Sequence, residues 1–498
     1  MSAPHDRPAL LPPVVAGLGV FALMALLMPS TPAMGDAAEL ILALALAGIP
    51  HPTGYPLYVM AGTLFVRAAH ALGISWVVAA NLWSVTGAAV AAAAYTRLVQ
   101  HLVAALEDDA RLAAFRGGVR AVAVAFPVIA LALNPVWIDA ATGAEVYSWN
   151  CALLALGAAF MLGRLRATSA ASDAGETHAA LAWGLLCGAC AAHHVTSLLF
   201  VLPMTVALVA TLVRAGRWRA SLALTGVVAS LIPLASYGWI AWRAAHPAPF
   251  QWPVEPRWSS WWFHVRAALY THYLGRFAPT VPEWTLIKGG LLVWILPGMS
   301  LGALFALRTT SRPARWGLLA LLGGAALQVV FVVSYGVPDA AMYLLPALLA
   351  SLSVGAPLLL WLARRTSRAV AFAAAAGLVL ALAAWSVPRA LTERLALARV
   401  DAGFRKAWRS IPFERGIVLW ADDHYHRFLA LQLLEGQRPG LYMENPDMLV
   451  WHARREAFRR RFGFDPLEGL SLRTAKDLEE IPTNVRRRAK VPVLVLPQ

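Results

Sequence analysis

The stretch GDAAELILALALAGIPHPTGYPLY, residues 35–58, follows directly on an apolar run and carries two acids beside a His-Pro-Thr-Gly-Tyr-Pro turn. The acids are Asp36 and Glu39, and residues three apart share one face of a helix. Such a pair suits a general base, a group that binds a hydroxyl acceptor, or a ligand set for a divalent cation near a phosphate. The alternative is a helix cap, with Asp36 at the N-cap and Glu39 completing a capping-box-like pattern.

The composition around this stretch is that of a polytopic membrane protein. Of the 498 residues, 59% are hydrophobic and only 14% are charged, against about 25% in soluble domains. The net charge of +15 is compatible with nucleic-acid binding, but the basic residues fall in short loops and in the C-terminal tail, without a basic stripe. We therefore expect a lipid bilayer as partner and no nucleic acid.

About eleven apolar stretches are long enough to cross a bilayer of about 30 Å. They lie at 9–28, 76–96, 119–134, 146–163, 179–192, 194–213, 220–242, 286–307, 315–334, 341–362 and 369–388. If these helices alternate in direction, the arginine clusters share one side, which is the cytoplasm by the positive-inside rule. Asp36, the tryptophan-rich loop at 243–285 and the tail then face outward. The segment 55–72 breaks the alternation, so we expect a helix along the outer interface, within a first outer loop of residues 30–75.

After Pro388 the sequence becomes charged and mixed. Strands are predicted at 416–420, 440–444 and 491–496, and a helix at 424–434. These elements predict a small extracytoplasmic α/β domain at 389–498, after an all-α transmembrane domain at 1–388. Its segment WADDHYHR (420–427) fits either a metal site or a strand-to-helix turn capped by Asp423.

Other ionisable and aromatic residues are expected at the outer ends of helices, where such groups are functional candidates by default. Glu145 and Tyr147 follow a helix end, although an interfacial aromatic belt also explains the aromatic residues. The pair His193 and His194 could meet a phosphate or a hydroxyl, or be a satisfied structural pair. Asp339 and Tyr343 lie one helical turn apart, with an N-cap as the alternative for Asp339.

Three motifs resemble those of the GT-C glycosyltransferases, in particular the protein O-mannosyltransferase-like branch that includes transmembrane protein 260. They are Asp36-x-x-Glu39, His51-Pro52-x-Gly54-Tyr55-Pro56-Leu57 and Glu145-Val146-Tyr147. The resemblance implies an enzyme that transfers a sugar, mannose in that branch, from a polyprenyl-phosphate carrier to a protein or glycan acceptor outside the cytoplasm. It assigns the catalytic role to Asp36 with Glu39 beside it, the second acidic position to Glu145, and the turn that closes over the site to His51.

Together these inferences predict an inverting membrane glycosyltransferase with Asp36 as its base. The expected substrate-binding residues are His51, Tyr55, Glu145, Tyr147, His193, His194, Asp339 and Tyr343. No cofactor is required by this scheme, and a divalent cation is an open alternative. The usage of alanine and arginine indicates a GC-rich bacterium and hence its inner membrane.

Two other classes of function compete with this prediction. A transporter or flippase would use the same acids for proton coupling, but it should carry ionisable residues near mid-membrane and broken helices in matching halves. A non-catalytic scaffold that presents the tail leaves the outer acids unexplained. The sequence favours the enzyme.

Overall fold

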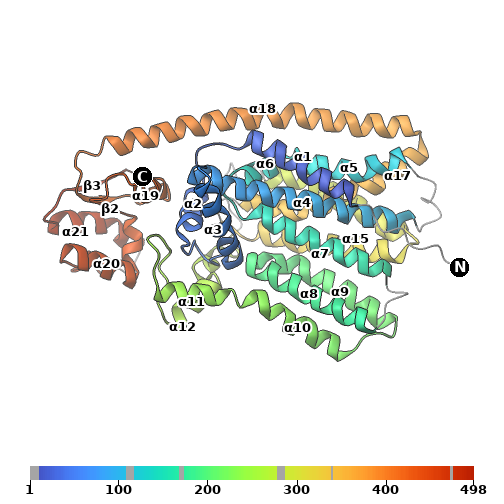
Figure 1. The fold of residues 1–498 in the computed structure, drawn as a ribbon, viewed down its shortest axis with the longest axis horizontal. Coiled ribbons are helices and arrows are strands. Elements are labelled where there is room, and N and C mark those ends of the chain that lie inside the picture. Colours follow the sequence, from blue (N-terminus) through green and yellow to red (C-terminus); the bar gives the residue numbers. More distant parts are fainter. Residues whose placement is uncertain are drawn as a thin grey trace. The chain divides into compact units, whose positions relative to one another are not determined.

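The computed structural model describes residues 10–107, 117–167, 173–276, 287–337, 340–471 and 475–497. The chain folds into two compact units, each assembled from segments far apart in sequence (Figure 1). Unit 1 comprises Met1–Met28, Leu82–Ser236 and Leu269–Glu393, and unit 2 comprises Pro29–Asn81, Tyr237–Ala268 and Arg394–Gln498.

Unit 1 is helical throughout its described part. Its helices are α1 (Leu11–Leu27), most of α4 (Trp76–Glu107), α5 (Gly118–Ala132), α6 (Pro135–Thr142), α7 (Tyr147–Ala167), α8 (Asp173–His193), η1 (Val195–Ser197), α9 (Leu198–Arg214), α10 (Ala220–Leu234), most of η2 (Ala268–Tyr273), η3 (Leu291–Ile295), α14 (Leu296–Arg308), α15 (Arg312–Val333), η4 (Ala340–Leu344), α16 (Leu345–Leu352), α17 (Gly355–Arg365) and the first part of α18 (Arg368–Arg409).

Helices α8 and α10 of this unit lie side by side (Figure 1), and small residues let them pack closely. A Cβ at Gly184 would lie 2.1 Å from the carbonyl oxygen of Gly226, and one at Gly188 would lie 2.2 Å from that of Ser230. The spacing Gly-x-x-x-Gly is the pattern that lets membrane helices approach backbone to backbone. Larger side chains at these two glycines would force the helices apart.

Within the described residues, eight helices are long and apolar enough to cross a membrane, or nine if the bent pair α5 and α6 is one span. The chain is therefore a multi-pass membrane protein, as predicted. The run expected at 9–28 is the shorter apolar helix α1, and the run at 179–192 lies in α8, which is not among the eight. The segment expected along the interface forms α3 (Pro56–Ala71), which is likewise not among them.

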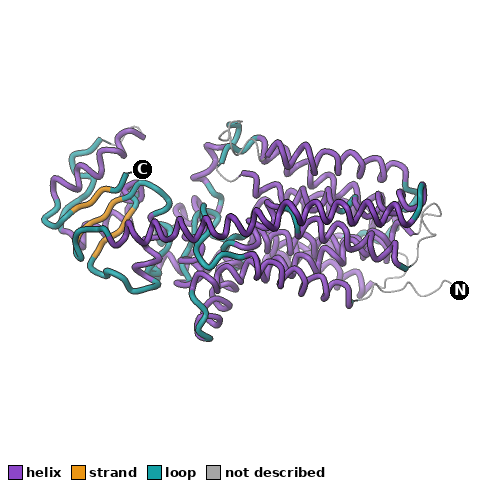
Figure 2. Tube along the Cα trace, turned by 90° about the horizontal axis from the view of Figure 1, so that it is seen from above, coloured by secondary structure: helices purple, strands orange, loops and turns teal. Residues whose placement is uncertain are grey.

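Unit 2 combines the first loop, a central segment and the tail. Its elements are α2 (Ala37–Leu46), α3, α11 (Tyr237–Ala245), α12 (Trp258–Val265), the end of α18, β1 (Gly416–Leu419), α19 (Tyr425–Leu433), β2 (Leu441–Glu444), η5 (Pro446–Val450), α20 (His452–Phe462), η6 (Ala475–Glu480), α21 (Ile481–Arg488) and β3 (Val493–Val495). The predicted strands and the helix after the first strand are confirmed, within a few residues. The strands, orange in Figure 2, are parallel in the order β2-β1-β3.

The tail from Arg394 onward belongs to the same compact unit as Pro29–Asn81 and Tyr237–Ala268. Helix α18 continues through Pro388 to Arg409. Leu42 and Ala43 of α2 belong to the same buried cluster as Phe428 of α19 and residues of β1 and β2. Helix α2 of the first loop therefore contributes apolar side chains to a buried core of the tail.

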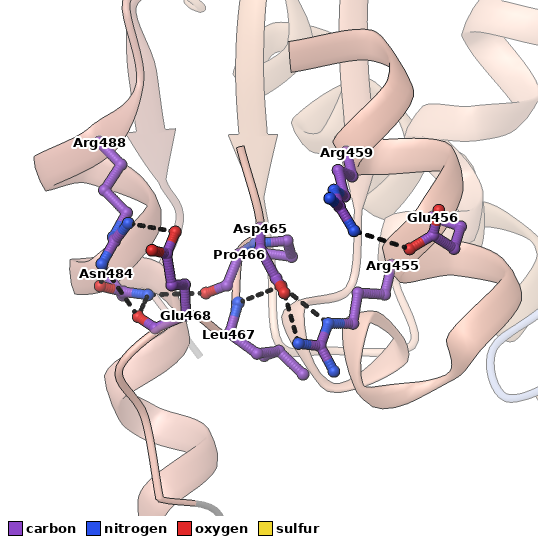
Figure 3. A network of polar contacts seen from close by, with 9 residues as sticks. All are labelled: Arg455, Glu456, Arg459, Asp465, Pro466, Leu467, Glu468, Asn484 and Arg488. Carbon is purple, nitrogen blue, oxygen red and sulfur yellow. Dashed lines mark hydrogen bonds and ion pairs between the residues drawn. The ribbon is translucent and has the colours of Figure 1, made fainter. Parts of the chain in front are cut away.

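A network of polar contacts joins α20, the loop at 465–468 and α21 in the tail (Figure 3). Arg455 of α20 donates to Asp465, whose Oδ1 also accepts the backbone N–H of Leu467 at 3.0 Å. Asn484 of α21 donates to the Pro466 carbonyl at 2.8 Å. These bonds hold the loop after α20 against α21.

Candidate active site

Asp36 and Glu39 occupy different environments although they share the start of α2. Asp36 stands at the N-cap position, but its side chain makes no capping hydrogen bond, and its carboxylate is 48% exposed. Glu39 is only 3% exposed, and its carboxylate accepts from His51, so it does not complete a capping box. The capping alternative therefore does not account for either acid.

His51 connects the two acids. Glu39 Oε1 accepts the His51 backbone N–H at 2.5 Å and lies 3.2 Å from Nδ1. The other ring nitrogen, Nε2, lies 3.0 Å from the Tyr55 hydroxyl and 3.6 Å from Asp36 Oδ2. When Nδ1 carries the proton, Glu39 fixes the orientation of the ring and Nε2 faces Tyr55 and Asp36.

The turn 48–55 that carries His51 is held by the 250–252 segment. The Trp252 N–H donates to the Ile49 carbonyl at 2.7 Å. A Cβ at Gly48 would lie 1.9 Å from the Phe250 carbonyl oxygen, so only glycine allows this approach. The indole of Trp252 presents a T-shaped contact to the His51 ring, with the centroids 6.4 Å apart.

Gly54 and Tyr55 complete the turn in left-handed backbone conformations, with φ of 82° and 39°. A Cβ at Gly54 would lie 3.0 Å from Nε2 of His264, which comes from α12. The positive φ at Tyr55 is uncommon for a bulky residue and occurs where the surroundings hold the backbone. Here it accompanies the placement of the Tyr55 hydroxyl beside His51.

Two more histidines, His264 and His426, lie near this group. Both are buried, with 4% and 3% of their surface exposed. Burial lowers the pKa of His264 to about 3 and that of His426 to about 4, the latter against the charge of Glu39. Within the described residues, Nε2 of each ring has no hydrogen-bond partner. Both are therefore neutral at pH 7.

Glu39 carries the buried negative charge of the site. Burial acts to raise the pKa of Glu39, but the charge and hydrogen bonds of His51 outweigh it, so the pKa is lowered. Glu39 is thus ionised at neutral pH. A buried carboxylate that is hydrogen-bonded to a histidine is poorly accessible to a substrate. Glu39 is therefore better suited to orient His51 than to react itself.

The same side chains could hold a divalent cation. One donor atom from each of Asp36, Glu39 and His51 lies within 4.8 Å of the others, and this is the only such group among the described residues. Two carboxylates and an imidazole suit zinc or manganese. The alternative metal site at 420–427 is not such a group.

A cavity of about 1010 Å³ shares a wall residue with the site. It lies between residues 244–257 and α20, and Trp252 lines it together with Glu255, Arg257, Arg454 and Arg460. Trp252 thus contacts His51 on one side and the cavity on the other. The space is large enough for an extended sugar or peptide segment.

Three of the remaining predicted residues form a second group in unit 1, and they are Tyr147, His194 and Tyr343. His194 lies 5.8 Å from Tyr147 and 5.6 Å from Tyr343 between ring centroids, and the two tyrosine rings are 5.5 Å apart. His193 is buried and donates from Nε2 to the Val146 carbonyl at 2.9 Å. His193 therefore anchors the start of α7.

Glu145 joins the same region through its backbone. Ser84 of α4 donates to the Glu145 carbonyl at 3.0 Å, and the Glu145 N–H donates back to the serine oxygen at 2.9 Å. These bonds fix the position of the loop that carries Glu145 and Tyr147. Asp339 lies outside the described residues.

The predicted cap of the tail helix is wrong in its residue. Helix α19 begins after His424, and Asp422 Oδ1, not Asp423, accepts the His424 backbone N–H at 2.7 Å. The sequence does not predict His264 or His426 as site residues. His264 belongs to the tryptophan-rich loop at 243–285, and His426 belongs to the segment 420–427. Nothing in either segment indicates that they meet at Glu39, because 162 residues separate the two histidines (426 − 264).

Comparisons with known proteins identify a matching family model and solved structures with a similar fold. Residues 36–217 match the family described as the protein O-mannosyl-transferase TMEM260 N-terminal domain. No curated protein sequence matches the chain significantly. The crystal structure of ArnT from Cupriavidus metallidurans bound to undecaprenyl phosphate has a TM-score of 0.55 at 15% identity, covering 96% of this chain and 89% of that chain. Its apo state has a TM-score of 0.54 at 17% identity, covering 90% and 88%.

Proposed function

We propose that this chain, whose residues 36–217 match the protein O-mannosyl-transferase TMEM260 N-terminal domain family and whose fold is similar to the GT-C fold of ArnT, is a membrane glycosyltransferase that uses a polyprenyl-phosphate-linked sugar. ArnT binds undecaprenyl phosphate, and this chain has the apolar helices that such a lipid requires. The acceptor is a hydroxyl of a protein or glycan. The sugar is mannose by the family likeness.

The observation that carries the proposal is the chain of contacts from Glu39 through His51 to Asp36. Asp36 is the acid of this group that reaches the surface, and its Oδ2 lies 3.6 Å from His51 Nε2. A general base must come within hydrogen-bond reach of the proton that it removes. Asp36 is suited to that task, and we reassign Glu39 from catalysis to the orientation of His51.

The reaction is a single displacement that inverts the sugar. Asp36 takes the proton of the acceptor hydroxyl as the acceptor oxygen forms a bond to C1 of the sugar. The bond from C1 to the phosphate oxygen breaks, and its electron pair leaves with the polyprenyl phosphate. Positioning of the acceptor and the base beside the donor supplies much of the rate.

The cavity beside Trp252 is the proposed entry of the acceptor. It adjoins His51 through the Trp252 indole, and aromatic and arginine side chains offer stacking surfaces and hydrogen-bond donors. The arginine distribution in the sequence supports an extracytoplasmic position for this site, with the chain in a bacterial inner membrane. The group Asp36, Glu39 and His51 lies outside the eight candidate spans, which supports the enzyme over a proton-coupled transporter.

The test is a transfer assay with the purified protein and a panel of polyprenyl-phosphate sugars, which follows release of polyprenyl phosphate. Wild type should release it from at least one donor, and Asp36→Asn should lose at least about 100-fold in kcat, the lower range for general base catalysis. Glu414→Gln is the matched control, because it neutralises an acid of unit 2 whose side chain is 73% exposed. Full turnover by Asp36→Asn refutes the base assignment, and uptake of an intact donor without release supports the transporter.

A further inference from the structure

Arg427 of the tail holds the backbone that leads into Asp36. Its Nη2 donates to the Ala33 carbonyl at 2.6 Å and to the Pro32 carbonyl at 3.2 Å, across 394 residues in the first case. The side chain is 4% exposed and lies over the ring of Phe404, 4.9 Å from its centroid. A buried guanidinium thus binds the backbone carbonyls of the two residues that lie two and three positions before Gly35.

The helix that carries Arg427 also packs on the helix that begins at Asp36. Helices α19 and α2 contact each other, and Phe428 and Leu431 share a buried cluster with Leu42 and Ala43. Arg427 therefore lies on the helix that packs against α2 and reaches the backbone that precedes it.

We propose that Arg427 is a positioning residue for transfer, so that the C-terminal part of the chain completes the active site. This inference rests on the proposed function, with Asp36 as base. The entry loop to α2 has a glycine at position 35 with φ of 65°, which gives the backbone freedom just before the base. Two hydrogen bonds from Nη2 restrict that freedom, because this one nitrogen donates to the carbonyls of two consecutive residues and is fixed in the plane of a buried guanidinium.

The chain supplies a matched control in Arg438. Its Nη1 and Nη2 donate to the carbonyls of Ile411 and Arg409 at 2.9 and 3.3 Å, and it lies over Trp408 at 5.9 Å. Arg438 thus clamps two carbonyls and covers an aromatic ring in the same unit, as Arg427 does, but it holds the end of α18. Both substitutions to methionine remove two hydrogen bonds to carbonyls and a contact with an aromatic ring, and Arg438→Met also removes an ion pair with Glu414 at 3.4 Å.

The experiment compares Arg427→Met, Arg427→Lys and Arg438→Met in the full-length protein. We expect Arg427→Met to lower kcat by about 10- to 100-fold, the cost of a misplaced reacting group, with KM for the donor nearly unchanged. Arg427→Lys keeps the charge without the fork and should lose less. Hydrogen exchange at the first amides of α2 should speed up in Arg427→Met and not in Arg438→Met.

The outcomes separate the positioning role from a structural one. Equal kcat in Arg427→Met and Arg438→Met, or unchanged exchange at the start of α2, overturns the inference. If Arg427→Met does not fold, wild-type kcat and exchange in Arg427→Lys overturn it instead. If wild type transfers no sugar, the proposed function fails, and the exchange comparison alone still tests whether Arg427 orders the loop.

Discussion

Glu39→Gln tests whether the buried acid orients His51. The carboxylate of Glu39 accepts from the His51 backbone at 2.5 Å and lies 3.2 Å from its ring nitrogen, at 3% exposure. Glutamine has the same shape but no charge, and its NH₂ group cannot accept. The substitution therefore weakens both contacts without opening a cavity.

The magnitude follows from the two contacts. A hydrogen bond to a charged group contributes about 1.5–3 kcal/mol, and a neutral one about 0.5–1.5 kcal/mol. Loss of the charge should thus cost about 1–1.5 kcal/mol for each contact and about 2–3 kcal/mol in total. For activity, loss of the group that orients His51 beside the base Asp36 should lower kcat by about 10- to 100-fold, the range for loss of a side chain that orients a metal-bound histidine.

The assay measures kcat for sugar transfer and the midpoint of thermal unfolding in the same detergent. Glu176→Gln is the control, because Glu176 is also buried, at 6% exposure, and pairs with Arg164 and Arg217 at 2.7 and 2.8 Å. We expect both variants to lower the unfolding midpoint and only Glu39→Gln to lower kcat strongly. A normal kcat in Glu39→Gln, or an equal loss in Glu176→Gln, would show that orientation of His51 by this carboxylate is not needed.

Three further predictions concern stability and topology. Acid should destabilise unit 2. The pKa of Glu39 is lowered in the folded protein, so the stability that its charge provides is lost as the pH falls through that pKa. The pKa of His426 is about 4 in the folded protein and about 6.5 in the unfolded chain, so the free energy of unfolding should fall by up to about 3 kcal/mol between pH 6.5 and 4. The midpoint of thermal unfolding should fall as the pH is lowered over this range, and it should fall less in His426→Asn. A midpoint that does not change with pH would contradict these pKa shifts. Gly48→Ala should lower the midpoint by several degrees, because its Cβ would lie 1.9 Å from the Phe250 carbonyl, whereas Gly19→Ala, with nothing within 4 Å, should not. A reporter enzyme fused to the C-terminus should be active only outside the cytoplasm, and cytoplasmic activity would overturn the proposed orientation.

Much of the fold could be predicted because its signals are local. Apolar runs long enough for a bilayer predict a multi-pass protein, and short runs of apolar and β-branched residues predict the strands of the tail. The candidate site was predictable in part for the same reason: Asp36, Glu39, His51 and Tyr55 lie within 20 consecutive residues (36 to 55). Their spacing and the turn between them bring their side chains together.

What the sequence determined by itself was therefore the class of the protein and the residues of the first loop. Only the tertiary structure decided which acid is buried and which reaches the surface, because two residues on one helical face have the same local pattern. It also decided that Arg427 reaches the Ala33 carbonyl across 394 residues and that the tail packs on α2. Such contacts depend on packing of apolar faces that no local pattern specifies, so the partners of a buried charge become visible only in the folded chain.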